Sequence, residues 1–105
     1  LFEWVIENLL KNALDAMEKA HGEVSFNISD SGGELIIDVA DNGKGIDPKF
    51  KKDVFRPGYS TKTRGWGLGL SLSKRIIEDY HKGKLILIDS NPGKGTTFRI
   101  KLLKN

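Results

Sequence analysis

The sequence predicts an α+β fold: a two-layer α/β sandwich in which helices pack on one face of a mixed, mostly antiparallel sheet. Two segments repeat apolar residues with a helical period, and others alternate apolar and polar residues as strands do. Short turns join the predicted strands in pairs, which favours antiparallel hairpins. The chain has 105 residues, of which 38% are hydrophobic, a size that suits one domain around one core.

The first helix is predicted over residues 2–20 and ends at Gly22. At about 100° per residue, its apolar side chains fall on one arc of the helix. These side chains are Phe2, Val5, Ile6, Leu9, Ala13, Ala16 and Met17.

Four strands are predicted in two hairpins. Val24, Phe26 and Ile28 alternate with polar residues, as in a half-buried strand, and the turn at residues 31–33 leads into a second strand over residues 34–41. Residues 85–88 and 96–102 form the second pair, which is joined by a turn at residues 91–93.

The segment between the hairpins should contain a long loop and a second helix. Asp47 and Pro48 can start a short helix, with aspartate as the cap and proline at the first position. Residues 55–67 show neither period, and a loop of that length is often functional. Apolar residues then recur every four positions in a helix that Gly83 stops. They are Leu68, Leu72, Ile76 and Tyr80.

Composition excludes several classes of protein. There is no cysteine, so a disulfide framework and a thiolate zinc site are excluded. No apolar run approaches the roughly 18 residues of a transmembrane helix. Seven basic and two acidic residues give residues 44–66 a net charge of +5 within a total of +3, which suits a polyanion. Nucleic acid is one candidate, although this segment has no zinc-finger spacing and no RNP-like aromatic strand.

Four polar or glycine-rich blocks together supply the groups that a nucleoside-triphosphate pocket needs. They provide a metal ligand, a buried acceptor, backbone amides and a hydroxyl group. The blocks are residues 8–12, 41–45, 65–69 and 93–97.

Asn8, Asn12 and Asp15 form a polar stripe at the border of the apolar arc of the first helix. Asn12 lies about 20° from Val5 around the axis, so it should be partly buried. Its amide oxygen is a suitable ligand for Mg²⁺, which prefers oxygen ligands and bridges to phosphates. The alternative is a structural amide bonded to neighbouring backbone.

Asp41 ends a strand whose inward row is Leu35, Ile37 and Val39, so its carboxylate should lie on the floor of a pocket. A buried carboxylate needs hydrogen-bond donors, and the exocyclic amine of adenine is one. Thr96 should face the interior beside Asp41. Gly43 and Gly45 would let a planar base approach the backbone. The alternative is an exposed turn aspartate.

Glycines 65, 67 and 69 precede the second long helix, where free amides and the helix dipole can bind phosphate. They could equally serve as a hinge. Lys62 or Arg64 could neutralise a β- or γ-phosphate, or could be solvated loop charges. Phe55 is expected to anchor the loop.

In this order, the blocks resemble the N, G1, F, G2 and G3 boxes of the histidine-kinase-like ATPase superfamily, which has the Bergerat fold. The matching ranges are residues 8–15, 41–46, 55–62, 65–70 and 95–98. The run from Phe55 to Lys62, followed closely by Gly65 to Leu70, is most similar to sensor histidine kinases. Asp15 departs from the pattern, because many members carry a basic residue there.

The resemblance implies that the domain binds ATP and Mg²⁺, with Asn12 on the metal, Asp41 on adenine and a lid over the triphosphate. The nucleotide-binding residues it implies are Asn8, Asn12, Asp41, Gly43, Gly45, Ile46, Tyr59, Thr61, Lys62, Arg64, Gly65, Gly67, Leu68, Gly69, Leu70 and Thr96. Without nucleotide, residues 54–66 are expected to be mobile.

One position separates classes within the superfamily. The gyrase-type and chaperone-type ATPases, the alternative function, place a glutamate base four residues before the metal asparagine. Here that position is Asn8, and Glu7 lies about 140° away from Asn12 around the helix. The resemblance therefore favours a protein histidine kinase over an ATPase clamp.

Residues 1–105 are accordingly expected to be the catalytic ATP-binding domain of a histidine kinase, truncated at its N-terminus. The acceptor histidine and any base would lie outside this chain, so it would hold no catalytic residue of its own. The expected partners are the dimerisation domain of the same protein, in a homodimeric parent, and a response regulator. No nucleic-acid or direct membrane contact is expected. The domain would be cytoplasmic, and the parent could be anchored in the inner membrane.

Overall fold

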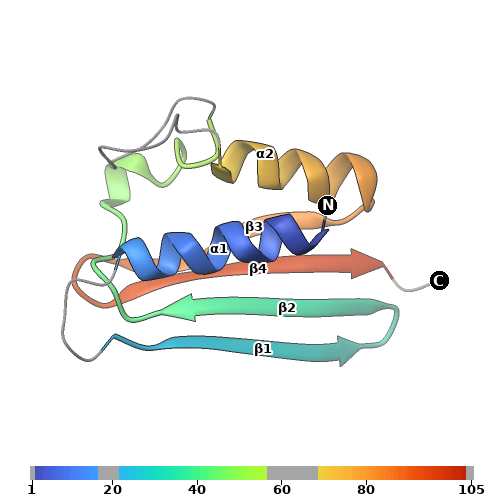
Figure 1. Cartoon of the computed structure of the whole chain (residues 1–105), viewed down its shortest axis with the longest axis horizontal. Helices are drawn as coiled ribbons and strands as arrows, with labels where there is room; N and C mark the ends of the chain where they lie inside the picture. The colour runs from blue at the N-terminus through green and yellow to red at the C-terminus, as the bar shows by residue number, and fades with distance from the viewer. Residues whose placement is uncertain (1, 17–21, 57–68, 104–105) are drawn as a thin grey trace.

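A computed structural model describes residues 2–16, 22–56 and 69–103 of the chain (Figure 1). In chain order the elements are α1 (Phe2–Ala16), β1 (Val24–Ser31), β2 (Glu34–Asp41), the 3₁₀ helix η1 (Pro48–Phe50), α2 (Gly69–Arg75), the π-helical turn η2 (Ile76–Tyr80), β3 (Lys84–Asn91) and β4 (Gly95–Leu103). The strands form one four-stranded sheet in the order β1-β2-β4-β3, and each neighbouring pair is antiparallel. The predicted α+β class is therefore confirmed.

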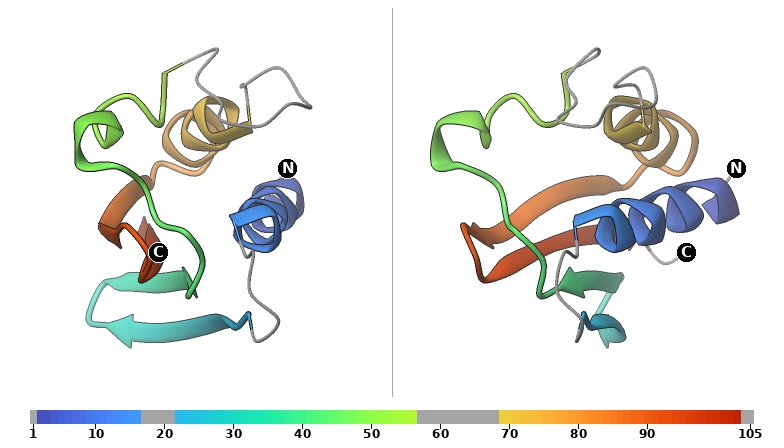
Figure 2. Two further views of the ribbon diagram at one scale, coloured as in Figure 1. Left: turned by 90° about the vertical axis from the view of Figure 1, so that its left-hand side faces the viewer. Right: turned by 60° about the vertical axis from the view of Figure 1, so that its left-hand side comes forward.

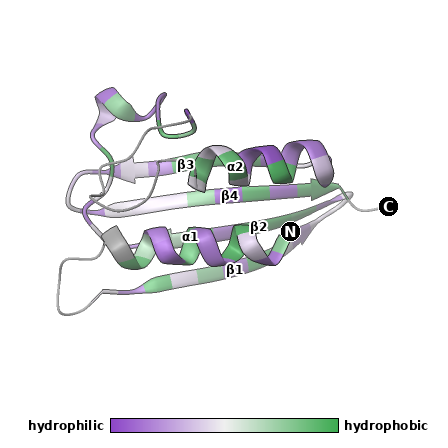
Figure 3. Ribbon diagram, turned by 45° about the horizontal axis from the view of Figure 1, so that its top comes forward, coloured by the Kyte–Doolittle hydropathy of each residue, from purple (hydrophilic) through white to green (hydrophobic). Residues whose placement is uncertain are grey.

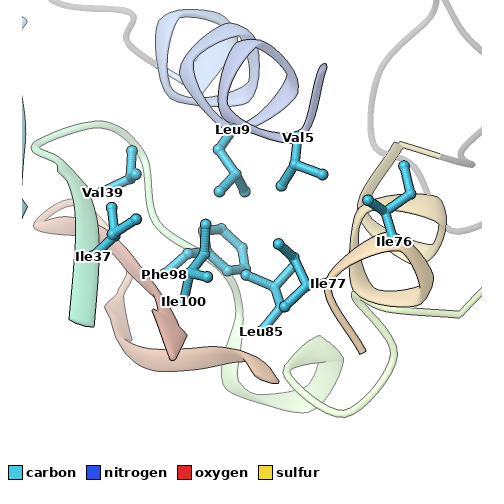
Figure 4. Packing of buried hydrophobic residues seen from close by; sticks show 9 residues of the cluster. All are labelled: Val5, Leu9, Ile37, Val39, Ile76, Ile77, Leu85, Phe98 and Ile100. Carbon is cyan, nitrogen blue, oxygen red and sulfur yellow. The ribbon is translucent and has the colours of Figure 1, made fainter. Parts of the chain in front are cut away.

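Both helices lie over the same face of the sheet (Figure 2), and the core fills the space between the layers. Val5 and Leu9 of α1 and Ile76 of α2–η2 meet apolar side chains of β2, β4 and β3 there (Figure 4). Hydrophilic and hydrophobic positions alternate along both helices (Figure 3), as expected for helices with one buried face.

The register of the sheet arranges its buried face in rows that cross β2, β4 and β3. Ile37 pairs with Ile100, and Ile100 pairs with Leu85; each is at most 3% exposed. The next row contains Val39, Phe98 and Leu87. The predicted inward row of β2 is thus confirmed.

The prediction of a half-buried first strand is wrong. Phe26 and Ile28 of β1 pair with Val39 and Ile37, yet they are 41% and 60% exposed. The alternation correctly indicated a strand, but it could not reveal which of the two edge strands, β1 or β3, lies outside the buried cluster. The buried cluster is centred on β2, β4 and β3, so β1 lies at its margin.

The second helix buries a different face from the one its four-residue spacing indicates. Leu72 and Tyr80 are exposed, whereas Ser73, Ile76 and Ile77 are buried. A spacing of four residues turns about 40° around the axis at each step, so a series of four cannot stay on one face. Of the described members of that series, Ile76 is the one that is fully buried.

The short helix predicted at Asp47 is confirmed as η1. The Asp47 side chain accepts a hydrogen bond from the Lys49 backbone N–H at 3.0 Å, and Pro48 occupies the first position. A few residues later, the Phe55 ring packs edge-on against Phe98, with ring centroids 6.0 Å apart.

Candidate functional site

A third row crosses the same three strands and is polar instead of apolar. Asp41 at the end of β2 pairs with Thr96 of β4, and Thr96 pairs with Ser90 of β3. Thr96 is 6% exposed and Ser90 is 1% exposed, so both hydroxyl groups are buried. The sequence predicted Asp41 and Thr96 as neighbours, but Ser90 was not predicted.

Asp41 is a half-buried acceptor. Its Oδ1 accepts a hydrogen bond from the Gly43 backbone N–H at 2.8 Å. Burial raises the pKa of Asp41 above its ordinary value, and hydrogen bonds from the backbone of Gly43 and Thr96 partly oppose this rise. The charged form is therefore held by backbone donors, and a donor from a ligand would stabilise it further.

The loop after β2 is hydrogen-bonded to the hairpin that joins β3 to β4. The Ile46 N–H donates to Ser90 Oγ at 2.8 Å, and the Gly93 N–H donates to the Lys44 carbonyl oxygen at 2.8 Å. The chains approach so closely that a Cβ atom on Gly45 would lie 2.1 Å from the Asn91 carbonyl oxygen. Gly45 also has a φ of +75°, which glycine adopts readily. The close contact with the hairpin therefore requires a residue without a side chain at position 45.

Gly95 brings the start of β4 against the end of β2. A Cβ atom at Gly95 would lie 1.9 Å from the Asp41 carbonyl oxygen, and its φ is +114°. The pairing of Asp41 with Thr96 thus depends on the absence of a side chain at the preceding residue.

Asn8 joins the two helices. Its Nδ2 donates to the buried Ser73 Oγ at 3.1 Å. The Asn8 side chain also lies so close to the start of α2 that a Cβ atom on Gly69 would be 2.7 Å from its Oδ1. Two predicted site residues, Asn8 and Gly69, therefore lie side by side, and the link through Ser73 was not predicted.

Asn12 lies one helical turn after Asn8 and is partly buried, as the helical wheel predicted. Glu7, in contrast, is exposed. The side chain of Asp15 lies outside the described part of the structure.

Phe55 is held from two sides. Besides its contact with Phe98, its ring lies 4.7 Å from Lys74 Nζ, which also bonds to the Leu85 carbonyl oxygen at 3.1 Å and to Glu78 at 2.8 Å. The predicted packing of Phe55 is thus present at the point where the basic loop begins.

The remaining predicted site residues divide into two sets. Ile46 and Leu70 are partly buried and pack against the core. The others lie outside the described residues: Tyr59, Thr61, Lys62, Arg64, Gly65, Gly67 and Leu68. The expected mobility of residues 54–66 likewise falls mostly on residues that are not described.

A shallow hollow of about 360 Å³ opens beside Asp41, between the ends of β1 and β2, and Glu23 and Asn42 contribute to its lining. Among residues 2–16, 22–56 and 69–103, no three His, Cys, Asp or Glu side chains gather into a metal cluster. A metal ion held by this site would need amide, hydroxyl or ligand oxygens. The arrangement can present the Asp41 carboxylate as an acceptor, with the Thr96 hydroxyl group beside it in the same row, to a planar polar ligand.

The model of the family "Histidine kinase-, DNA gyrase B-, and HSP90-like ATPase" matches residues 1–105. The chain belongs to this family. The matched range includes all five segments whose resemblance to the family was described above: residues 8–15, 41–46, 55–62, 65–70 and 95–98. The expected family is therefore confirmed.

Similar members of the family are sensor kinases. The chain is 40% identical over 103 residues to the C4-dicarboxylate transport sensor protein DctB of Rhizobium meliloti, covering 97% of this chain and 16% of that protein. It is 38% identical over 98 residues to sporulation kinase C of Bacillus subtilis, covering 93% of this chain and 22% of that protein. The chain thus spans about a fifth or less of these relatives.

Solved structures of this ATPase family share the fold. The catalytic domain of histidine kinase ThkA, in a nucleotide-free form, superposes with a TM-score of 0.81 at 34% identity. The match covers 95% of this chain and 64% of that chain. No helix in the described part of the structure is long and apolar enough to cross a membrane.

Proposed function

We propose that this domain binds Mg-ATP and serves as the catalytic part of a sensor histidine kinase in two-component signalling. The γ-phosphoryl group would pass to a histidine on a separate dimerisation domain. The observation that carries the proposal is the polar row in which the half-buried Asp41 pairs with the buried Thr96, within a chain that belongs to the histidine-kinase-like ATPase family.

In the proposed complex, Asp41 accepts a hydrogen bond from the exocyclic amine of adenine. The Asp41 carboxylate is partly desolvated, so a ligand donor would replace water that burial has removed. The Thr96 hydroxyl lies beside it in the same row and completes the recognition of the base. Gly43, Gly45 and Ile46 form the adjoining wall.

The triphosphate would lie between the helices and the basic loop. Asn12 would hold Mg²⁺ through its amide oxygen, together with phosphate oxygens, and Asn8 would lie at the same pocket. The phosphates would be bound by residues of the F and G2 boxes, as the family resemblance implies. These are Tyr59, Thr61, Lys62, Arg64, Gly65, Gly67, Leu68, Gly69 and Leu70.

The chain's own contribution to phosphoryl transfer is then positioning. The metal ion, when bound, supplies charge neutralisation at the phosphates. Asp41, Thr96 and the glycine segments hold the nucleotide so that its terminal phosphoryl group faces an imidazole from the acceptor domain. No base in this chain is required, because an imidazole nitrogen is itself nucleophilic.

The gyrase-type ATPase clamp is the less favoured alternative. Asn8 stands where a base would be needed, and its amide bonds to Ser73. Glu7, the neighbouring carboxylate, is exposed. Steady ATP hydrolysis by the purified chain, at a rate that Asn8→Ala abolishes, would reinstate the clamp.

The partners would be the dimerisation and phosphoacceptor domain of the same homodimeric protein and a downstream response regulator, with no nucleic acid. The domain would work in the cytoplasm of a parent protein that can be anchored in the inner membrane. The sensor protein and the sporulation kinase among the relatives support the signalling role within these proposals.

Calorimetric titration with ADP and with a non-hydrolysable ATP analogue, in magnesium, tests nucleotide binding. Asp41→Asn should weaken binding by roughly 10- to 150-fold, the value of a hydrogen bond to a charged group. Asp38→Asn is a matched control, because Asp38 lies three residues earlier on the opposite face of β2 and pairs with Arg99. Equal affinity in wild type and Asp41→Asn would contradict the proposed base recognition.

A further inference from the structure

Ser90 reaches the buried face of the sheet through an irregularity in β3. Leu87 pairs with Phe98, but the next paired residue of β3 is Asp89, opposite Thr97. Ile88 is therefore the extra residue of a β-bulge, which shifts the alternation of the strand by one. As a result Ser90 points inward beside Thr96 and is 1% exposed.

The hydrogen bonds of Ser90 have a direction. The Ile46 N–H can only donate, and it donates to Ser90 Oγ at 2.8 Å. The Ser90 hydroxyl has one proton of its own, and the described structure offers Thr96 Oγ1 at 2.9 Å as its acceptor. If Thr96 donated instead, the Ser90 proton would be left in a buried position without that acceptor, which is unfavourable.

This direction determines what Thr96 can offer to a ligand. Once Thr96 Oγ1 accepts the Ser90 proton, its own proton must point away from Ser90. Asp41 lies on that other side, because Asp41 and Ser90 flank Thr96 on neighbouring strands. At its Asp41 end, the row therefore combines the Asp41 acceptor with a Thr96 donor.

We propose that Ser90 is a positioning residue that fixes the Thr96 hydroxyl as a donor and thereby selects adenine over guanine. This inference rests on the proposed nucleotide binding. Adenine presents an amine donor next to a ring-nitrogen acceptor, which complements an acceptor followed by a donor. Guanine presents a carbonyl oxygen next to an N–H group. Its carbonyl oxygen would face the Asp41 carboxylate, and its N–H would face the proton of Thr96 and not a lone pair. A freely rotating Thr96 could accept from that N–H and would tolerate guanine better.

The test measures the ratio of ADP to GDP affinity by calorimetry in wild type, Ser90→Ala, Thr96→Val and the double variant. Ser90→Ala should reduce the preference for ADP by about tenfold, the value of one misdirected hydrogen bond. In the Thr96→Val background, Ser90→Ala should change the ratio no further, because Ser90 acts through Thr96. Ser90→Thr, which keeps a hydroxyl group, should retain the preference. Ser29→Ala, at an exposed serine of β1, is the control for a serine removed elsewhere.

Three results separate the possibilities. An unchanged ADP:GDP ratio in a folded Ser90→Ala protein would overturn the inference alone. An equal change in the wild-type and Thr96→Val backgrounds would also overturn it, because Ser90 would then act independently of Thr96. Failure of wild type to bind ADP would instead overturn the proposed function on which the inference rests.

A measurement without any variant covers the case in which Ser90→Ala does not fold. Neutron diffraction from crystals of the ADP complex locates the exchanged hydroxyl deuterons directly. A deuteron bonded to Ser90 Oγ and directed at Thr96 supports the proposed direction. A deuteron bonded to Thr96 and directed at Ser90 overturns it.

Discussion

The middle of the sheet and its Asp41 end use the same three strands for opposite purposes. In the middle, the row of Ile37, Ile100 and Leu85 is apolar and at most 3% exposed. At the end, the row of Asp41, Thr96 and Ser90 is polar, and its members bond to one another or to nearby backbone. The row of Val39, Phe98 and Leu87 lies between these two rows. The polar row is two residues beyond it along β2 and β4, and three residues beyond it along β3 because of the bulge.

This difference shows how a small domain can carry buried polar groups. A buried polar atom is tolerated where partners are present, and no buried side-chain nitrogen or oxygen among the described residues lacks one. The polar row lies where two loops supply backbone N–H groups, from Gly43 and Ile46. In the middle of the sheet, the backbone N–H groups bond within the strand pairs, so they do not serve buried polar side chains there.

The largest expected effect is on the apolar row. Ile100→Ala should reduce the free energy of unfolding by about 2–5 kcal/mol, because it leaves a cavity where the side chain is fully buried. Urea unfolding followed by circular dichroism measures this loss. ADP affinity at a temperature where the variant is folded should stay close to that of wild type. A loss of affinity as large as that of Asp41→Asn would show that the two rows are not separable.

The next effect concerns the contact that closes the polar row. Gly95→Ala should cost roughly 2 kcal/mol or more, because its Cβ would overlap the Asp41 backbone and its φ is positive. Gly93→Ala is the matched control. Its φ is also positive, at +77°, but no atom lies within 4 Å of its Cβ position. It should cost only about 1 kcal/mol. Equal losses of stability in urea unfolding would mean that backbone strain, and not the overlap, decides the effect.

A smaller effect is expected at the second apolar row, where Lys74 covers Phe55. Lys74→Met should lower the free energy of unfolding by about 1 kcal/mol, through loss of the cation–π contact and the bond to the Leu85 carbonyl. Lys49→Met is the control, because Lys49 is exposed and lies over the exposed ring of Phe50. A thermal melt of both variants distinguishes them. Indistinguishable midpoints would argue that Lys74 does not stabilise Phe55.

The smallest effect appears in the pH dependence of stability and has opposite signs on the two faces of β2. On the outer face, the hydrogen bond from Arg99 lowers the pKa of Asp38, so this group stabilises the fold above the unfolded pKa of about 3.9. That contribution is lost as the pH falls through the folded pKa. The difference in stability between wild type and Asp38→Asn should therefore shrink below about pH 4.

On the inner face, burial raises the pKa of Asp41, so the folded state binds its proton more tightly than the unfolded state. The contribution of Asp41 is then most favourable below about pH 4 and is lost as the pH rises through the folded pKa. Asp41→Asn should gain stability relative to wild type over that rise. Urea unfolding at several pH values checks both signs, and parallel curves for the two variants would contradict the assignment.

Much of the site could be read from local patterns, because its blocks are short. The alternation of β2 placed Asp41 on the inward face, and that of β4 placed Thr96 beside it; the register confirms both. The helical wheel correctly predicted partial burial of Asn12. Each of these inferences used a period that a few residues define.

The errors and omissions arose where a period is interrupted or where the neighbour is distant in sequence. The position of β1 outside the buried cluster depends on the strand order and on the packing of the helices, which no local alternation contains. Ser73 accepts a hydrogen bond from Asn8, which lies 65 residues earlier in the chain, so no local pattern could reveal this contact. Ser90 was not predicted as a buried residue, because the bulge at Ile88 reverses the alternation of β3 and turns Ser90 inward.

The sequence by itself determined the α+β class, the family and the chemical groups of the site, because these depend on residue types at short, regular spacings. Only the tertiary structure decided which edge strand lies outside the buried cluster, which face of the second helix is buried, and that Ser90 joins Thr96 and Asp41 in one row. The physical reason is that strand order, bulges and close backbone approaches are set by packing between segments that are far apart in the chain.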